Sequence, residues 1–209
     1  MKINEIFHSI QGEGKNVGLP TIFVRTTGCN LRCRYCDTTY AYYEGKEMEL
    51  QDIMKEMKKW NCRRICLTGG EPLLQPEMPE LVDMLIHDGY EINIETNGSI
   101  DISDMTERDI TVSMDMKCPS SGMNDRMMEG NIKLLRGRDE LKFVIGNRED
   151  YGYAIDIVKK YKPPCGIVMQ PSWGELDAGK LAEWMLDDDI DARLSFQLHK
   201  ILWDNRKGI

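Results

Sequence analysis

The chain has 209 residues and a formal net charge of −8 at pH 7. This length suits one domain with a full core, and the excess of acids argues against a direct nucleic-acid partner, which needs a basic face. No apolar run approaches the length of a membrane span, and Glu5 stands where a signal peptide would begin its apolar stretch. We therefore expect a cytoplasmic single-domain protein over residues 1–209, without nucleic-acid or membrane partners.

Short apolar segments rich in β-branched residues alternate with amphipathic segments along the chain. The predicted strands are 21–25, 64–68, 91–95, 111–115, 140–145, 166–169 and 193–197. Helical apolar stripes lie between several of them, at 50–57, 81–85, 155–158 and 181–185, the last with Asp177 as its start. The stretch 97–110 is too short and polar for a good crossover helix. This alternation predicts parallel βαβ units. Seven strands are too few for a closed eight-stranded barrel, so we predict an α/β fold that forms an open, partial parallel β/α barrel.

Three cysteines, Cys29, Cys33 and Cys36, follow an apolar run at the spacing C-x3-C-x2-C. Zinc sites normally have four protein ligands, whereas a four-iron cluster held by three thiolates keeps one iron open to a small molecule. A zinc site with a distant fourth ligand, or three loop cysteines without a metal, are the alternatives. Clustered cysteines also indicate a reducing compartment. We interpret the remaining cysteines as structural: Cys62, Cys66, Cys118 and Cys165.

The other motifs fall at the ends of predicted strands. Gly69-Gly70-Glu71-Pro72 and Thr96-Asn97-Gly98 each follow one, and the segments 113–117 and 170–172 end later ones. Glycines at such a position let the backbone approach a ligand closely, although a plain strand-to-helix turn would also use them. The C-terminal ends of parallel strands share one edge, where sites gather. This shared edge predicts one active site.

The cysteine loop together with Gly69-Gly70-Glu71-Pro72 resembles the signature of the radical S-adenosylmethionine (SAM) enzymes. Further motifs resemble the 7-carboxy-7-deazaguanine synthase family: Gln11-Gly12-Glu13-Gly14, Cys36-Asp37-Thr38, Ile94-Glu95-Thr96-Asn97-Gly98 and Gln197-x-His199-Lys200. These motifs run from the first dozen residues to the last dozen, so the resemblance covers the whole chain.

This resemblance implies a [4Fe-4S] cluster, SAM and Mg²⁺ as cofactors, an external electron donor of the flavodoxin or ferredoxin type, and a homodimer. It implies that SAM is cleaved to a 5′-deoxyadenosyl radical that abstracts a substrate hydrogen. The implied reaction contracts the ring of 6-carboxy-5,6,7,8-tetrahydropterin to 7-carboxy-7-deazaguanine with loss of ammonia. It is a lyase reaction in the synthesis of queuosine or archaeosine.

The same resemblance assigns roles to individual residues. Metal ligands would be Cys29, Cys33 and Cys36 for the cluster and Thr38 for Mg²⁺. SAM would be bound by Tyr35, Cys36, Asp37, Gly70, Glu71, Ser113, Lys117, Gln170, Pro171, Ser172 and Trp173. Substrate would be bound by Ile10, Gln11, Gly12, Glu13, Arg25, Thr68, Gln197 and His199, with His199 and Lys200 as catalytic residues. The segment 113–117 is longer than the Ser-Pro-Lys of some members, which leaves open which of its residues touch SAM.

The chemistry of the substrate suits some of these residues. A carboxylate such as Glu13 can accept the adjacent N–H donors of a pterin edge, and the guanidinium of Arg25 can grip the substrate carboxylate. His199, expected at the end of the last strand, could relay a proton. The alternatives are a plain turn at Glu13, an ion pair of Arg25 with a surface acid, a core role for His199, and a capping role for Thr38.

Beyond the His-Lys pair the chain continues, and Trp203 is a large apolar group there. We predict that Trp203 anchors this tail across the mouth of the site and excludes water, a frayed terminus being the alternative. Two other functions stay open. One is a radical SAM activase that installs a glycyl radical on a protein partner, and the other is a non-catalytic iron–sulfur or zinc binding module.

Overall fold

The computed structural model describes residues 1–204, 206 and 208. Within them one sheet runs in the order β3-β1-β2-β4-β5-β6-β7-β8-β9. The strands are β1 (Lys2–Ile10), β2 (Pro20–Thr26), β3 (Lys46–Glu47), β4 (Arg64–Gly69), β5 (Glu91–Thr96), β6 (Thr111–Asp115), β7 (Glu140–Ile145), β8 (Gly166–Pro171) and β9 (Arg193–Leu194). From β2 to β9 all neighbours pair in parallel, whereas β1 is antiparallel to both β2 and β3. The sheet order is linear, so the barrel is open.

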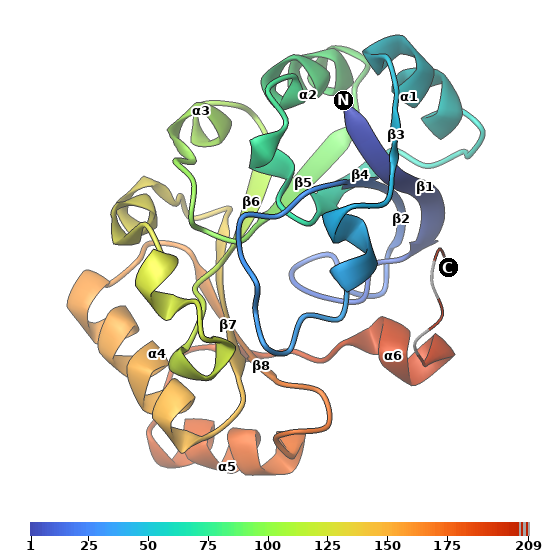
Figure 1. Cartoon of the computed structure of the whole chain (residues 1–209). Helices are drawn as coiled ribbons and strands as arrows, with labels where there is room; N and C mark the ends of the chain where they lie inside the picture. Colours follow the sequence, from blue (N-terminus) through green and yellow to red (C-terminus); the bar gives the residue numbers. More distant parts are fainter. Residues whose placement is uncertain (205, 207, 209) are drawn as a thin grey trace.

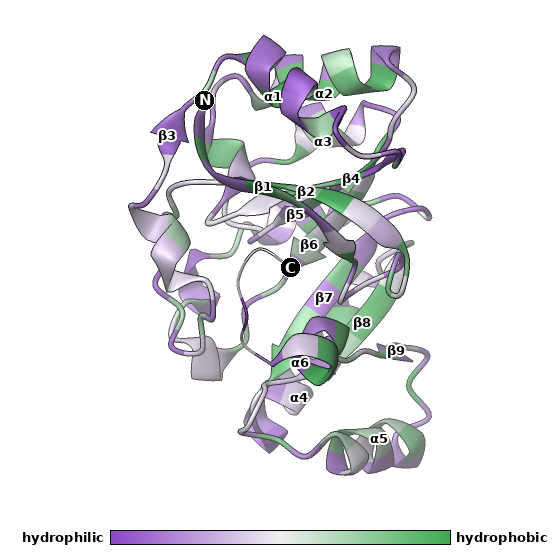
Figure 2. Ribbon diagram, turned by 90° about the vertical axis from the view of Figure 1, so that its right-hand side faces the viewer, coloured by the Kyte–Doolittle hydropathy of each residue, from purple (hydrophilic) through white to green (hydrophobic). Residues whose placement is uncertain are grey.

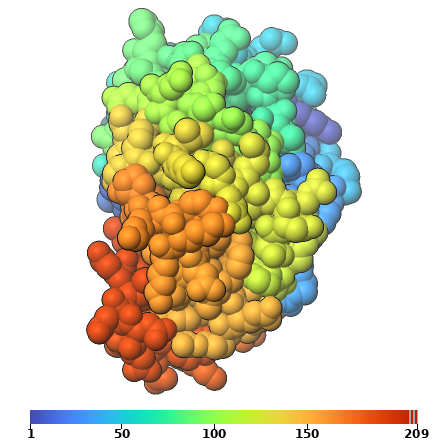
Figure 3. Space-filling view, turned by 90° about the vertical axis from the view of Figure 1, so that its left-hand side faces the viewer, coloured from blue at the N-terminus to red at the C-terminus, as the bar shows by residue number. Residues whose placement is uncertain are grey.

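Helices cover the outside of this curved sheet (Figure 1). The α-helices are α1 (Leu50–Met57), α2 (Met78–His87), α3 (Ser103–Thr106), α4 (Arg148–Tyr161), α5 (Ala178–Asp187) and α6 (Leu198–Trp203). The 3₁₀ turns are η1 (Thr39–Tyr42), η2 (Pro72–Leu74), η3 (Pro119–Ser121), η4 (Asn124–Arg126) and η5 (Glu129–Leu134). Figure 2 shows α1 to α3 along one side of the sheet and α5 beside its other end. Figure 3 shows the continuous outer surface to which α4, in orange, contributes. None of the described helices is long and apolar enough to cross a membrane.

The two faces of the sheet differ in polarity because successive side chains of a strand point to opposite faces. On the helix-covered face, apolar residues such as Leu67, Ile94 and Leu141 are fully buried in the core. The alternating residues on the other face are largely polar, among them Glu95 and Lys142, and they line a cavity. The interior of the barrel is therefore a polar site rather than a second core.

The predicted open α/β barrel is confirmed, and all seven predicted strands are present. Two strands were missed. In β1, the pairing with β2 shifts register between Ile3 and Glu5, which breaks the period of two that marks a strand, and β3 has only two residues. The predicted start of α5 is confirmed, since the Asp177 side chain accepts a hydrogen bond from Lys180 N at 3.0 Å.

The prediction of a last strand over 193–197 is wrong beyond Leu194, and His199 and Lys200 lie in α6 instead of at a strand end. β9 is the edge of the described sheet, so the following backbone finds no further strand on its outer side. A helix satisfies its own backbone groups, and α6 begins where Leu198 N donates to Gly12 O at 2.9 Å. This contact brings α6 to the N-terminal loop.

Candidate active site

A cavity of about 610 Å³ lies at the C-terminal ends of the parallel strands, a size common for small-molecule sites. Of the residues expected to bind the cofactors or substrate, all except Glu71 and Pro171 are among its described lining. These lining residues are Ile10, Gln11, Gly12, Glu13, Arg25, Cys29, Cys33, Tyr35, Cys36, Asp37, Thr38, Thr68, Gly70, Ser113, Lys117, Gln170, Ser172, Trp173, Gln197, His199 and Lys200. Motifs from both ends of the chain thus meet in one place.

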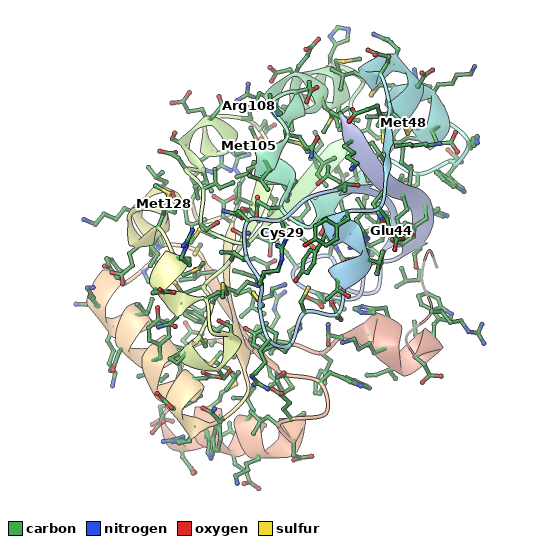
Figure 4. All side chains as sticks on the ribbon, viewed as in Figure 1. Cys29, Glu44, Met48, Met105, Arg108 and Met128 are labelled. Carbon is green, nitrogen blue, oxygen red and sulfur yellow. The ribbon has the colours of Figure 1, made fainter. Side chains whose placement is uncertain are left out.

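The cysteine loop follows β2 and crosses in front of the strand ends, with Cys29 near the centre of Figure 4. Arg32 supports this loop because its guanidinium donates to Cys29 O at 2.8 Å and to Leu31 O at 2.7 Å. The same guanidinium lies 4.2 Å from the centre of the Tyr42 ring. The loop geometry therefore depends on backbone contacts that Arg32 makes within the loop itself.

The three cysteine thiols are free, half-buried and close enough to affect one another. Burial raises the pKa of Cys29 and of Cys33, and the neighbouring thiol of Cys36 raises the pKa of both further. Among the described residues, no group of three or more His, Cys, Asp or Glu side chains is arranged to hold a single metal ion. A four-iron cluster does not require such an arrangement, since each thiolate binds a different iron. The three thiols line one cavity, which fits a cluster held by three thiolate ligands.

Two glycines bring the strand edge of β4 against the cysteine loop. A Cβ on Gly70 would lie 2.1 Å from Gly28 O, and one on Gly69, whose φ is +146°, would lie 2.4 Å from Thr26 O. No other residue fits this approach without moving the backbone. Glu71 N donates to Gly28 O at 2.8 Å and completes the contact.

Glu71 is fully buried and turns away from the cavity. Its carboxylate accepts hydrogen bonds from Asn97 N at 2.6 Å, Thr96 Oγ1 at 2.8 Å and Leu73 N at 3.0 Å. Burial raises the pKa of Glu71 to about 7, although these hydrogen bonds favour the charged form. This side chain ties the loop after β4 to the loop after β5.

Glu13 lies at the centre of the polar interior. Lys142 Nζ is 2.8 Å from its Oε2, and Gln197 Nε2 donates to its Oε1 at 2.9 Å. Burial alone would raise the pKa of Glu13, but the Lys142 ammonium outweighs this and lowers it. The side chain is therefore a carboxylate that can accept hydrogen bonds from a ligand.

Asp37 joins the cysteine loop to α6. Lys200 Nζ lies 2.8 Å from Asp37 Oδ2, Gln197 Nε2 donates to the same oxygen at 3.1 Å, and Thr38 Oγ1 donates to Asp37 Oδ1 at 2.9 Å. Thr38 makes no capping hydrogen bond to η1. A Cβ on Gly12 would lie 2.2 Å from His199 Nδ1. The imidazole of His199 is thus packed against the glycine of the N-terminal motif.

Arg25 lines the cavity and also pairs with an acid. Its Nε donates to Glu5 Oε1 at 2.8 Å, and Tyr40 Oη donates to the same oxygen at 3.0 Å. The guanidinium lies 5.7 Å from the centre of the Phe7 ring. Only its Nε takes part in the hydrogen bonds of the described residues, so the outer edge of its fork is available to an anion.

Two buried polar atoms on residues that line the cavity indicate that a ligand binds there. Tyr35 Oη and Gln170 Oε1 are buried without a hydrogen-bond partner among the described residues, and both residues line the cavity. A buried polar atom without a partner is costly. Lys117 Nζ, nearby in the lining, lies 2.5 Å from Asp115 Oδ2. These residues fit SAM, which has polar groups along its whole length.

Three charged residues of the interior had no role assigned to them from the sequence: Glu95, Asp115 and Lys142. Glu95 accepts hydrogen bonds from Gln11 Nε2 at 3.1 Å and from Thr68 Oγ1 at 3.0 Å. A signal was present for Lys142, since a lysine two residues from Glu140 in an otherwise apolar strand needs partners on the inner face.

Several described residues of the predicted tail lie at the cavity. Trp203 ends α6, is half-buried and lines the cavity, as do Arg206 and Gly208. Asn205, Lys207 and Ile209 lie outside the described residues. Whether the tail excludes water stays a prediction.

Known proteins resemble this chain in sequence and in fold. The family model of the Radical SAM superfamily matches residues 23–163. The chain is 40% identical to the 7-carboxy-7-deazaguanine synthase of Thermoplasma acidophilum over 100% of both chains, and 40% identical to that of Methanospirillum hungatei over 97% of this chain and 85% of that protein. Its fold matches the crystal structure of QueE from Escherichia coli with a TM-score of 0.78, at 24% identity, over 95% of this chain and 94% of that chain. The chain therefore belongs to the radical SAM superfamily and, within it, to the 7-carboxy-7-deazaguanine synthase family.

Proposed function

We propose that this protein is a 7-carboxy-7-deazaguanine synthase, a lyase that contracts the ring of 6-carboxy-5,6,7,8-tetrahydropterin and releases ammonia. The observation that carries the proposal is that a carboxylate, Glu13, and a guanidinium, Arg25, line the same cavity as the cysteine loop. The Glu13 carboxylate suits the N–H edge of a pterin, and the Arg25 guanidinium suits a carboxylate. The product would serve queuosine or archaeosine synthesis.

In this proposal Cys29, Cys33 and Cys36 hold the [4Fe-4S] cluster. With the cluster and SAM bound at these residues, the chemistry that they would supply is the abstraction of a hydrogen atom from the substrate by a radical derived from SAM. The backbone at Gly70 and the polar groups of Tyr35, Asp37, Ser113, Lys117 and the segment 170–173 orient SAM. Glu71 holds the loops around it in place through its buried carboxylate.

The substrate side of the cavity has a separate set of residues. Glu13 accepts the pterin N–H groups, Arg25 binds the carboxylate, and Ile10, Gln11, Gly12, Thr68 and Gln197 supply further contacts. His199 relays a proton, and Lys200 pairs with Asp37 of the cysteine loop. Thr38 contributes a hydroxyl to Mg²⁺, an ion that is satisfied by one or two protein oxygens together with water and substrate oxygens.

An external one-electron donor of the flavodoxin or ferredoxin type would reduce the cluster, and we expect a homodimer. The test is an anaerobic assay of the reconstituted protein with 6-carboxytetrahydropterin, SAM, Mg²⁺ and reductant, read as 7-carboxy-7-deazaguanine and ammonia. Cys33→Ala is the control that should lose iron, SAM cleavage and product together. SAM cleavage that depends on an added protein and yields no deazaguanine would instead point to an activase. Absence of SAM cleavage by the iron-loaded protein would point to a binding module.

A further inference from the structure

Lys142 is a buried lysine of β7 to which the proposed function assigns no role. Its Nζ lies 2.8 Å from Glu13 Oε2 and 3.2 Å from Asp115 Oδ1, and its side chain, only 10% exposed, lines the cavity. Burial alone would lower the pKa of Lys142, but Asp115 and Glu13 raise it well above its usual value. The side chain is therefore an ammonium held between two carboxylates.

An ammonium has three N–H donors and no acceptor. One Lys142 donor is hydrogen-bonded to Glu13 Oε2, and the contact with Asp115 Oδ1 is an ion pair without a hydrogen bond, so at least one donor has no protein partner among the described residues. Asp115 is fixed from its other side, because Lys117 Nζ lies 2.5 Å from its Oδ2. Lys142 and Glu13 both line the cavity, so a ligand beside the Glu13 carboxylate is within reach of the Lys142 ammonium.

Gln197 is the other donor beside Glu13, but its amide is already occupied. Gln197 Nε2 donates to Glu13 Oε1 at 2.9 Å and to Asp37 Oδ2 at 3.1 Å. A side-chain amide carries two N–H donors, so neither is left for a ligand. Of these two neighbours of Glu13, only Lys142 keeps a free donor.

The edge of a 2-amino-4-oxopyrimidine ring presents, in order, an amino donor, an N3–H donor and a carbonyl acceptor. A carboxylate can satisfy the first two groups in parallel, and the third needs a donor next to that carboxylate. We propose that Lys142 donates a hydrogen bond to the 4-oxo oxygen of the substrate, beside the two bonds accepted by Glu13. This inference rests on the proposed function and makes Lys142 a specificity-determining residue for the 4-oxo ring.

The test compares 6-carboxytetrahydropterin with its 4-amino analogue, in which an amino group replaces the carbonyl and N3 carries no hydrogen, so Glu13 also contributes to the preference between them. The wild-type enzyme should prefer the 4-oxo substrate in kcat/KM. Lys142→Met should lower kcat/KM for that substrate about ten- to hundred-fold, mainly through KM, and should narrow the preference about tenfold. Lys142→Gln keeps a neutral N–H donor and should retain part of the preference. Iron content and SAM cleavage without substrate should stay at wild-type levels in both variants.

A double variant separates this contact from simple charge balance. Lys142→Met with Asp115→Asn removes one positive and one negative charge from the interior. The proposed hydrogen bond predicts that the double variant keeps the narrowed 4-oxo preference of Lys142→Met, whereas full recovery of the wild-type preference would overturn the inference. An unchanged preference in Lys142→Met and Lys142→Gln would overturn it as well, while the proposed function would stand. A wild-type enzyme that makes no deazaguanine would overturn the proposed function and this inference with it.

Discussion

At the scale of single residues, the site consists of charged side chains that hold one another in place. A continuous series of contacts runs from Lys142 through Glu13, Gln197 and Asp37 to Lys200. Members of such a network depend on one another, so their replacements are not expected to be additive. Each residue is therefore best tested with a variant that keeps part of its hydrogen bonding.

Arg25→Lys should weaken substrate binding, because an ammonium cannot grip a carboxylate with two parallel N–H donors. It also cannot reproduce the bond from Arg25 Nε to Glu5. Loss of a charge-assisted pair costs about 1.5–3 kcal/mol, so KM for the substrate should rise about ten- to hundred-fold, with iron content and SAM binding unchanged. Glu5→Gln, which keeps an acceptor for Arg25, should have a smaller effect. An unchanged KM in Arg25→Lys would show that Arg25 has a structural role and does not bind the substrate.

Thr38→Ala should weaken the activation of turnover by Mg²⁺, because a weakly held hard cation loses one of its few protein oxygens. Thr38→Ser keeps the hydroxyl and should stay close to the wild type. The measurement is the initial rate against Mg²⁺ concentration after treatment with a chelator. Equal rates of chelated and Mg²⁺-supplied wild-type enzyme would contradict the metal role.

At the scale of elements, α6 is the helix that completes the cavity. It has six residues, which are too few for a helix that is stable on its own. Two contacts hold it in place: the hydrogen bond from Leu198 N to Gly12 O and the ion pair of Lys200 with Asp37. Its inner residues thereby reach the cavity, while Ile201 and Leu202 are exposed. The helix thus links the N-terminal motif to the cysteine loop.

Trp203→Ala should uncouple the reaction by admitting water to the cavity during the radical step. We expect a wild-type iron content, but less deazaguanine formed per SAM cleaved. Leu202→Ala is the matched control, because Leu202 is the preceding residue of α6 and is 50% exposed. An equal product yield per SAM in the two variants would end the idea that Trp203 covers the site.

At the scale of the whole molecule, Glu71 links the stability of the fold to pH. Its pKa is raised by burial from 4.5 to about 7. Between these values the folded state keeps a proton that the unfolded state has lost, so the free energy of unfolding falls as pH rises. One pKa unit corresponds to 1.36 kcal/mol, which gives a loss of about 2–4 kcal/mol.

Denaturant unfolding of the cluster-free protein from pH 5 to pH 8 measures this loss. Glu71→Gln should be less stable at every pH, because its amide nitrogen cannot accept a hydrogen bond and would face either Thr96 Oγ1 or Asn97 N. Its free energy of unfolding should also lack this dependence on pH. Glu107→Gln, at an exposed residue, is the control, and its free energy of unfolding should change with pH as that of the wild type does. The same slope in Glu71→Gln would assign the pH dependence to other groups.

Much of this architecture follows from local features of the sequence. The parallel strands could be predicted because their apolar runs are continuous and their ends carry glycines. The cysteine loop and the Gly69-Gly70 edge could be predicted because their spacing and their lack of side chains are local properties. By contrast, the register shift in β1 conceals its strand pattern.

Only the tertiary structure decided the partners of the charged residues. Lys142 and Glu13 lie 129 positions apart, and their contact exists because β7 and the N-terminal loop meet inside the barrel. Glu71 follows a predicted ligand-binding glycine pair, yet its carboxylate faces Thr96 and Asn97 instead of the cavity. His199 lies on a helix rather than at a strand end because β9 has no further strand to pair with. The sequence determines which chemical groups the protein has, whereas their burial and pairing are set by segments that meet only when the sheet closes around them.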